Sequence, residues 1–185
     1  AMYQEMSSVP ATMTAAKACD AWGSFKGHVV EQADAESAYT QSMLKTQVPT
    51  WVSLPPHRKP AAWKGMKNPV CPMELALYGH PEAGGHWERH CEDYLKTQGF
   101  QTVMDWRSCF FHPEHKCYLT VYVDDFKLAG PKARLPEAWA LLRKGLNLED
   151  PHPMNLFLGC THKTSVRTSP WSGKKVRTIE YDVQS

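Results

Sequence analysis

Three stretches of the chain carry apolar residues at the spacing of an α-helix that buries one face. They are residues 12–22, 83–98 and 136–144. In the first stretch Met13, Ala16 and Trp22 share one side, and a glycine directly follows each of the three stretches. The shared side of the second stretch is formed by Ala83, Trp87, Cys91 and Tyr94. Because side chains three or four residues apart line one face and glycine often terminates a helix, the pattern predicts three amphipathic helices.

Shorter apolar runs between these helices have the length or the alternation of β-strands. The runs are residues 28–33, 108–111, 117–123, 126–129 and 156–158. A turn-forming His-Pro-Glu-His segment separates the second run from the third, and an Asp-Asp pair separates the third from the fourth. Strands and helices follow one another without a regular βαβ alternation, which favours the α+β class. Residues 49–69 are rich in proline and polar residues around a short extended piece at 51–54, which predicts an exposed loop or hairpin.

The composition adds mainly exclusions to this picture. Apolar residues make up 42% and charged residues 22% of the 185 residues, which argues against a disordered, collagen-like or coiled-coil chain. No apolar run approaches the roughly 18 residues of a membrane-spanning helix, and the N-terminus shows no secretory signal. Six cysteines without a Cys-x-x-Cys pair are typical of reduced, mostly buried thiols in an intracellular protein. We therefore expect an intracellular protein with no membrane partner.

The charge is unevenly distributed along the chain. The net charge of +2 does not by itself indicate a nucleic-acid partner, but residues 163–185 carry +3 and residues 1–162 carry −1. Trp171 lies within this basic segment and is a candidate for stacking on a base, beside cations that could contact phosphates. A solvated, charged hairpin explains the same segment at least as well. Trp22, Trp87 and Trp139 have helical spacing and are predicted to lie in the core.

Asp124 and Asp125 form an unusual pair because apolar, β-forming residues flank them on both sides. Adjacent carboxylates repel each other, and more strongly at the edge of an apolar core. An exposed hairpin turn is the ordinary explanation of such a pair. A bound divalent cation would relieve the repulsion, and carboxylates that clamp two metal ions support phosphoryl transfer. Such a site needs a third carboxylate, and Asp34, directly after the predicted strand 28–33, is the candidate.

At this point the residues resemble a known family. Tyr122-Val123-Asp124-Asp125 resembles the Tyr-x-Asp-Asp motif of reverse transcriptases, specifically those of copia-type retrotransposons. Four further blocks are similar to motifs of that family and occur in its order. They are residues 32–39 (Gln-Ala-Asp-Ala-Glu-Ser-Ala-Tyr), 51–55 (Trp-Val-Ser-Leu-Pro), 76–79 (Ala-Leu-Tyr-Gly) and 157–159 (Phe-Leu-Gly). The ordered set makes the resemblance specific, although any one block could occur by chance.

The resemblance implies the palm of an RNA-directed DNA polymerase, an antiparallel sheet backed by helices, with partial fingers and the start of a thumb. It implies that Asp34, Asp124 and Asp125 are catalytic and hold two magnesium ions, with manganese as an alternative metal. The residues expected beside the incoming nucleotide are Ala35, Tyr39, Gly79, Glu82 and Tyr122, and those expected beside the primer and template are Phe157 and Gly159. Tyr39 takes the place of the family's aromatic residue that excludes a ribose 2′-hydroxyl.

The same resemblance divides the chain into two parts. Residues 1–162 correspond to the palm with partial fingers, and residues 163–185 to a basic tail or hairpin that begins the thumb. The expected partners are an RNA or DNA template with its primer and deoxynucleoside triphosphates, in a cytoplasmic particle or the nucleus. The RNase H and integrase domains of the family's polyproteins are not expected within these 185 residues.

Three positions depart from the family pattern and keep other hypotheses open. Glu82 replaces an uncharged amide, Gly85 replaces an arginine, and Lys127 stands where an apolar strand residue is usual. A catalytically inactive or domesticated palm, acting in nucleic-acid binding or assembly, is therefore the alternative to the enzyme. A third hypothesis is a zinc-dependent interaction module built on His86 and His90, which are four residues apart on a predicted helix. Surface histidines beside a buried cysteine explain that last pattern equally simply.

Overall fold

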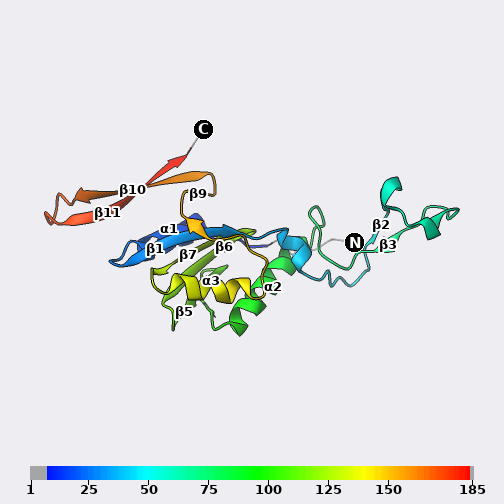
Figure 1. The fold of residues 1–185 in the computed structure, drawn as a ribbon, viewed down its shortest axis with the longest axis horizontal. Helices are drawn as coiled ribbons and strands as arrows, with labels where there is room; N and C mark the ends of the chain where they lie inside the picture. The colour runs from blue at the N-terminus through cyan, green and yellow to red at the C-terminus, as the bar shows by residue number, and fades with distance from the viewer. Residues whose placement is uncertain (1–7, 184–185) are drawn as a thin grey trace.

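The computed structural model describes residues 8–183, which form three α-helices, eleven β-strands and three short 3-10 helices. The helices are α1 (Met13–Gly23), α2 (Ala83–Thr97), α3 (Leu135–Arg143), η1 (Ala38–Gln41), η2 (Pro56–Arg58) and η3 (Ala61–Trp63). The strands are β1 (His28–Asp34), β2 (Trp51–Val52), β3 (Cys71–Pro72), β4 (Gln101–Thr102), β5 (Cys109–His112), β6 (Cys117–Tyr122), β7 (Asp125–Pro131), β8 (His152–Pro153), β9 (Leu156–Phe157), β10 (Cys160–Thr168) and β11 (Lys175–Val183). Figure 1 shows a central body from which β10–β11 extends at one end and β2–β3 at the other. None of the helices within residues 8–183 is long and apolar enough to span a membrane.

The central body is built on an antiparallel sheet of six strands in the order β4-β5-β6-β7-β1-β8. Strands β6 and β7 form a hairpin in which Tyr122 pairs with Asp125, and β1 lies on the other side of β7. Two strands of only two residues, β4 and β8, form the edges, and short edge strands offer little to an additional strand. The combination of helices with an antiparallel sheet confirms the predicted α+β class. The three predicted helices and the five predicted strands are present, whereas β4 and β8 are too short to have been expected.

The two faces of this sheet differ in polarity, because successive side chains of a strand point to opposite sides. On one face, α2 and α3 pack against a core that includes Leu119, Phe126 and Leu128. On the other face, α1 packs against β6 and β7, and Thr120 and Lys127 are completely buried there. The layer beneath α2 and α3 is therefore apolar, whereas the layer beneath α1 contains buried polar groups.

Helix α1 does not bury the face that its large apolar residues predict. The residues that it buries are Ala15, Ala16, Cys19, Asp20 and Gly23. Met13 is exposed, and Trp22 is only half-buried, with its indole N–H donating to the Lys116 carbonyl at 3.0 Å. The prediction of Trp22 in the core is wrong because α1 approaches the sheet through small residues: a Cβ atom on Gly23 would lie 2.0 Å from a methyl carbon of Val30. The predictions for the other two tryptophans, in α2 and α3, are confirmed.

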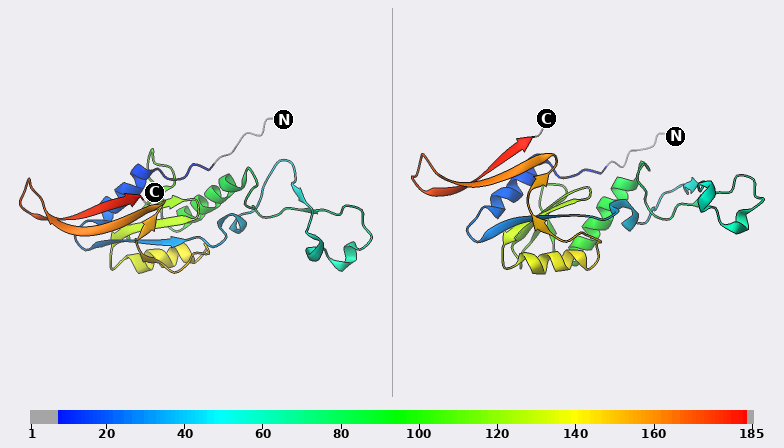
Figure 2. Two further views of the ribbon diagram at one scale, coloured as in Figure 1. Left: turned by 90° about the horizontal axis from the view of Figure 1, so that it is seen from above. Right: turned by 45° about the horizontal axis from the view of Figure 1, so that its top comes forward.

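The C-terminal residues form a second sheet of three strands in the order β11-β10-β9. Strands β10 and β11 make a long hairpin, here called the arm (residues 160–183), that projects beyond the central body (Figure 2). The basic segment, which the sequence predicts as a tail or a hairpin, contains paired strands over the residues that the structure describes. The expected boundary between residues 162 and 163 falls within β10 and stays a prediction.

The charges of the arm are partly compensated within it. Its outer face carries the ion pairs Lys163–Asp182 and Arg167–Glu180. The remaining positive charge of the arm lies on Lys174, Lys175 and Arg177. Trp171, between the two strands, is 95% exposed, so its ring is free of the core. Its role in base stacking stays a prediction.

The segment that contains β2 and β3 leaves the central body as an extended excursion (Figure 1). Its two short strands pair through Trp51 with Pro72 and Val52 with Cys71. None of the residues of η2 or η3 is buried. The predicted exposed loop or hairpin at residues 49–69 is confirmed.

All six cysteines are free thiols, and five of them are buried. Burial raises the pKa of Cys19 and of Cys117 to about 12, so both thiols are protonated and weakly nucleophilic at neutral pH. The prediction of reduced, mostly buried cysteines is confirmed.

A buried ion pair joins α1 to the central sheet. The Nζ atom of Lys127 lies 2.6 Å from Oδ1 of Asp20, and the two side chains are 0% and 2% exposed. Burial by itself would raise the pKa of Asp20, but hydrogen bonds and charge from His162, Lys127 and Tyr181 outweigh it and lower the pKa. The carboxylate is therefore ionised at neutral pH and balances the buried ammonium group.

We expect Asp20→Ala to lower the free energy of unfolding by roughly 3–5 kcal/mol, because it leaves the Lys127 ammonium buried without an anion. Urea unfolding at pH 7, followed by circular dichroism, measures the change. The matched control is Asp182→Ala, which removes the exposed partner of Lys163 and should cost less than about 1 kcal/mol. Equal losses in the two variants would contradict a structural role for the buried pair.

Candidate active site

Asp34, Asp124 and Asp125 lie together at one end of the inner strands β1, β6 and β7, and this end of the sheet is here called the acidic edge. Asp34 ends β1 and is the direct cross-strand partner of Asp125, which begins β7. Asp124 lies in the two-residue turn between β6 and β7. Because Asp125 and Lys127 are two residues apart on β7, they point to the same face of the sheet, which is the face that carries α1. The three carboxylates that the sequence singled out are thus neighbours in the fold.

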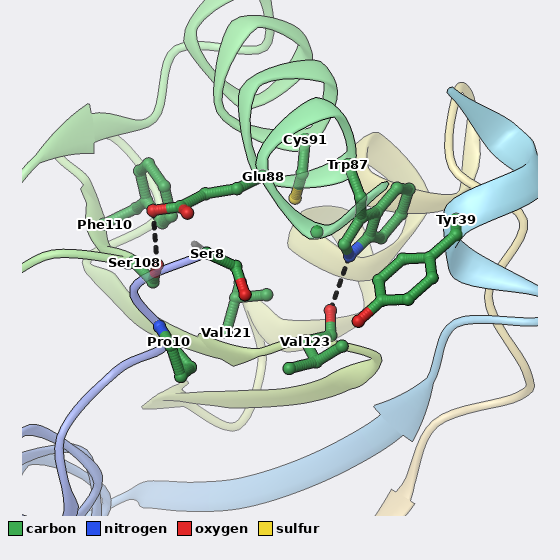
Figure 3. Close-up of a pocket in the computed structure, with 11 residues that line it drawn as sticks. Ser8, Pro10, Tyr39, Trp87, Glu88, Cys91, Ser108, Phe110, Val121 and Val123 are labelled. Atoms are coloured by element: carbon green, nitrogen blue, oxygen red, sulfur yellow. Dashed lines mark hydrogen bonds between the residues drawn. The ribbon is translucent and has the colours of Figure 1, made fainter. Parts of the chain in front are cut away.

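The turn that carries Asp124 is held by hydrogen bonds from two other elements. The indole Nε1 of Trp87 in α2 donates to the Val123 carbonyl at 2.6 Å (Figure 3). The amide of Ala35 donates to the Asp124 carbonyl at 2.7 Å. Val123 has a φ of 55°, a conformation that is unfavourable for a β-branched residue and persists where surrounding contacts impose it. The sequence did not predict the role of Trp87 in fixing the turn.

The carboxylates influence one another electrostatically. Burial, the negative charges of Asp34 and Asp124, and a hydrogen bond with Asp34 raise the pKa of Asp125 from 3.8 to about 6. A shift in this direction means that the folded protein disfavours the ionised form of Asp125. The edge therefore concentrates negative charge that the surrounding protein does not neutralise.

The donor set at this edge suits a hard divalent cation. Carboxylate oxygens are the ligands that magnesium and manganese prefer, and a cation would remove the repulsion that raises the pKa of Asp125. Within residues 8–183, however, no three His, Cys, Asp or Glu side chains are already arranged so that they could coordinate one metal ion. The residues present thus fit a metal by charge and chemistry, while their side chains are not pre-arranged as a cage.

Two tyrosine rings stand beside the carboxylates. Tyr39 in η1 packs against Tyr78 with the ring centroids 4.2 Å apart. Burial and the negative charge of Asp124 raise the pKa of both hydroxyl groups. The family resemblance predicts a nucleotide contact for Tyr39, whereas it assigns no separate role to Tyr78. Its sequence signal was its place in the Ala-Leu-Tyr-Gly block.

The remaining residues expected beside the nucleotide surround this edge in different ways. Ala35 is buried directly after β1, and Tyr122 is partly buried at the end of β6. Gly79 has a φ of 94°, and a Cβ atom there would meet no heavy atom within 4 Å. Glu82 precedes α2, with its carboxylate 3.6 Å from Nε2 of His86. The roles of all four residues stay predictions.

The Phe-Leu-Gly block forms the turn between β9 and β10. Phe157 pairs with Cys160 across this turn, and Leu158 and Gly159 both have positive φ values, of 51° and 73°. Positive φ at both central positions is typical of the tight turns that suit a twisted hairpin. Phe157 is buried, so its ring contributes to packing, and a primer contact there stays a prediction.

A narrow, mostly apolar pocket lies behind the turn of Asp124. Its lining includes Tyr39, Trp87, Glu88, Phe110 and Val123, and Figure 3 shows the Tyr39 hydroxyl near the Trp87–Val123 contact. Glu88 accepts a hydrogen bond from Ser108 across this pocket, at 3.4 Å. The Trp87 indole that lines this pocket is therefore also the group that hydrogen-bonds the turn at Val123.

The histidines of α2 have other partners than a metal. His86 is buried between Glu82 and Arg89, with Nη2 of Arg89 3.1 Å from its Nδ1. His90 packs against the Trp87 ring with centroids 6.0 Å apart. Because the described part of the chain offers no three-residue metal group, the structure does not support the zinc hypothesis.

We expect Asp125→Asn to stabilise the metal-free protein at neutral pH. The raised pKa of about 6 means that the ionised carboxylate opposes folding above that pH, and that this penalty vanishes as the pH falls towards 3.8. In EDTA the variant should gain about 1–2 kcal/mol at pH 7.5, after allowance for solvent screening, and almost nothing at pH 4. Thermal unfolding at the two pH values measures this, with Asp93→Asn on the exposed side of α2 as control. A gain of equal size at both pH values would show that charge repulsion is not its cause.

Comparison with known proteins places this sequence in a family. The family described as reverse transcriptase (RNA-dependent DNA polymerase) matches residues 1–168. Two Arabidopsis thaliana proteins, the retrovirus-related Pol polyproteins from transposons RE1 and RE2, are 30% and 27% identical over 137 residues. That alignment covers 72% of this chain and 9% of each relative, and no solved structure matches. The resemblance drawn from the sequence motifs is confirmed, and the chain belongs to the reverse transcriptase family.

Proposed function

We propose that this chain is the catalytic palm of an RNA-directed DNA polymerase that adds deoxynucleotides to a primer. The observation that carries the proposal is the grouping of Asp34, Asp124 and Asp125 at one sheet edge, where burial and the other two carboxylates raise the pKa of Asp125 to about 6. Family membership supports the same reaction class. In this reaction the primer 3′-oxygen bonds to the α-phosphorus of a nucleoside triphosphate, and the bond to the departing pyrophosphate breaks.

The three aspartates would hold two magnesium ions, which when bound neutralise phosphate charge and assist loss of the proton from the primer hydroxyl. The contribution of the protein is to place the carboxylates before substrate arrives. The β1–β7 pairing fixes Asp34 against Asp125, and the contacts of Trp87 and Ala35 fix the turn of Asp124. Fixed placement of charge supplies most of the catalysis in phosphoryl transfer.

The sugar and base of the incoming nucleotide would lie against the tyrosine pair. Tyr39 is backed by Tyr78, so its ring is a supported surface rather than a free side chain. The open space around Gly79 would allow a nucleotide to approach the backbone closely. The Glu82 carboxylate lies 3.6 Å from Nε2 of His86, but burial lowers the pKa of that imidazole, so Glu82 would still repel phosphates. On the primer side, the β9–β10 turn with Gly159 would contact the strand end.

We expect the protein to extend a DNA primer on an RNA template in the presence of magnesium, and Asp124→Asn to slow extension roughly a hundredfold or more. Gel analysis of a labelled primer measures both rates. The control is Glu114→Gln, an exposed carboxylate in the turn at the opposite end of β6. If the unmodified chain extends no faster than Asp124→Asn, the enzyme proposal fails and an inactive palm that binds nucleic acid becomes the better account.

We expect Tyr39→Ala to raise the incorporation of ribonucleotides relative to deoxyribonucleotides by roughly tenfold or more, because the ring that would collide with a 2′-hydroxyl is gone. Tyr39→Phe retains the ring and should keep the original discrimination. Single-nucleotide incorporation with each type of triphosphate gives the ratio. An unchanged ratio in Tyr39→Ala would remove this residue from sugar selection.

A further inference from the structure

A cluster of four polar side chains, of which Asp20 and Lys127 are fully buried, joins α1, β7 and the C-terminal sheet. The Asp20 carboxylate lies 2.6 Å from Nζ of Lys127 through one oxygen, and 3.3 Å from Nε2 of His162 through the other. The Tyr181 hydroxyl donates to the second oxygen at 2.8 Å. Lys127 also donates to the Ala16 carbonyl at 3.2 Å. We call these four side chains, Asp20, Lys127, His162 and Tyr181, the polar anchor.

The polar anchor connects structural units that are otherwise separate in sequence. Asp20 belongs to α1 and Lys127 to β7, whereas His162 and Tyr181 are cross-strand partners in the arm. His162 and Tyr181 are also in edge-to-face contact, with ring centroids 4.9 Å apart. Both strands of the arm are therefore held by a single carboxylate of the central body.

The position of the polar anchor relates it to the candidate active site. Lys127 follows Asp125 by two residues on the same strand, so both point to the same sheet face. The Nζ atom of Lys127 lies 4.9 Å from the ring centroid of Phe157, next to the β9–β10 turn. Lys127 thus contacts Phe157, beside the turn that is expected to meet the primer, and lies on the same strand as Asp125.

The chemistry of the polar anchor favours a role in placement over a role in stability. A buried ion pair is often no more stabilising than apolar residues of similar volume, because both charges lose their water. Directional contacts between ionised groups, however, permit only one arrangement of the elements they join. Other polar contacts hold the arm as well: the His162 amide donates to the Asn155 carbonyl at 2.7 Å, and Arg177, farther along the arm, donates to the carbonyls of Gly23 and His28.

We propose that the polar anchor positions the β9–β10 turn against the catalytic carboxylates and thereby sets where the primer end lies. This inference rests on the proposed polymerase function. Lys127, which departs from the apolar residue usual at its position, acts here as a positioning residue through Phe157 and Asp20. It does not touch the reacting atoms.

The test is the double variant Asp20→Leu/Lys127→Met, which removes both charges together and leaves no unpaired ion in the core. The matched control is Asp182→Leu/Lys163→Met, which replaces an exposed ion pair of the arm by the same residue types. Three measurements are made on each: urea unfolding, amide hydrogen exchange of residues 156–183, and primer extension with separate KM values for primer–template and for nucleotide. A conservative variant, Tyr181→Phe, removes a single hydroxyl and covers the case in which the double variant does not fold.

We expect the double variant to remain folded, to exchange the amides of the arm faster, and to raise the KM for primer–template roughly tenfold or more, with the nucleotide KM unchanged. Tyr181→Phe should show the same changes at smaller size, and the control none. Faster exchange with unaltered primer kinetics would overturn the positioning role, and unaltered exchange would overturn the anchoring itself. If the unmodified protein extends no primer, the proposed function fails and the positioning role with it, whereas hydrogen exchange still decides whether the cluster anchors the arm.

Discussion

The register between β1 and β7 is the constraint on which the candidate site depends. Antiparallel pairing sets Asp34 opposite Asp125, and the hairpin between β6 and β7 then places Asp124 next to both. A slip of one residue would turn Asp34 to the opposite face of the sheet together with the rest of its strand. The alternation of β1 opposes such a slip. Ala33 packs in the apolar core, whereas the side chain of Gln32 on the polar side accepts a hydrogen bond from the backbone amide of Asn155. Packing of the body thus determines the geometry of the site.

The division of the sheet into an apolar and a polar face follows from the same alternation. The apolar face is sealed by α2 and α3, which are themselves joined where the Tyr94 hydroxyl donates to the Leu141 carbonyl at 2.7 Å. The polar face is only partly covered, by α1 and by the C-terminal strands. A layer that is half covered cannot be closed by large apolar side chains alone, because those at its edge would be exposed to water. On this face Asp20 and Lys127 pair with each other, whereas the hydroxyls of Tyr118 and Thr120 are buried without a hydrogen-bond partner among the described residues.

Much of the fold was predictable because its signals are local. Apolar spacing and terminal glycines were enough for α2 and α3, and alternation was enough for β6 and β7. The approximate place of Asp34 beside the Asp-Asp pair followed from ordered motifs.

What could not be predicted depends on contacts between distant segments. Asp20 looks like a surface residue in the sequence, since nothing near it in the chain shows that Lys127 will lie 2.6 Å away. The burial of α1 through small residues was hidden for a similar reason, because close approach depends on the partner surface and not on residue size. The unexpected lysine in an apolar strand was a usable signal: a buried cation requires an anion from elsewhere in the chain.

Two carboxyl groups beside the same face of the sheet, those of Asp20 and Asp125, have pKa values shifted in opposite directions. At Asp20 the chain supplies its own cation, and the pKa of the carboxyl is lowered by Lys127, His162 and Tyr181 despite burial. At Asp125 burial acts together with the charges of the other two carboxylates, and the pKa rises. Within residues 8–183 no lysine or arginine forms an ion pair with the three aspartates of the edge, although lysine or arginine neutralises acids elsewhere in the fold. The described part of the chain therefore leaves this negative charge uncompensated, on a turn that hydrogen bonds from Trp87 and Ala35 hold in place. Charged groups arranged in this way are typical of functional sites.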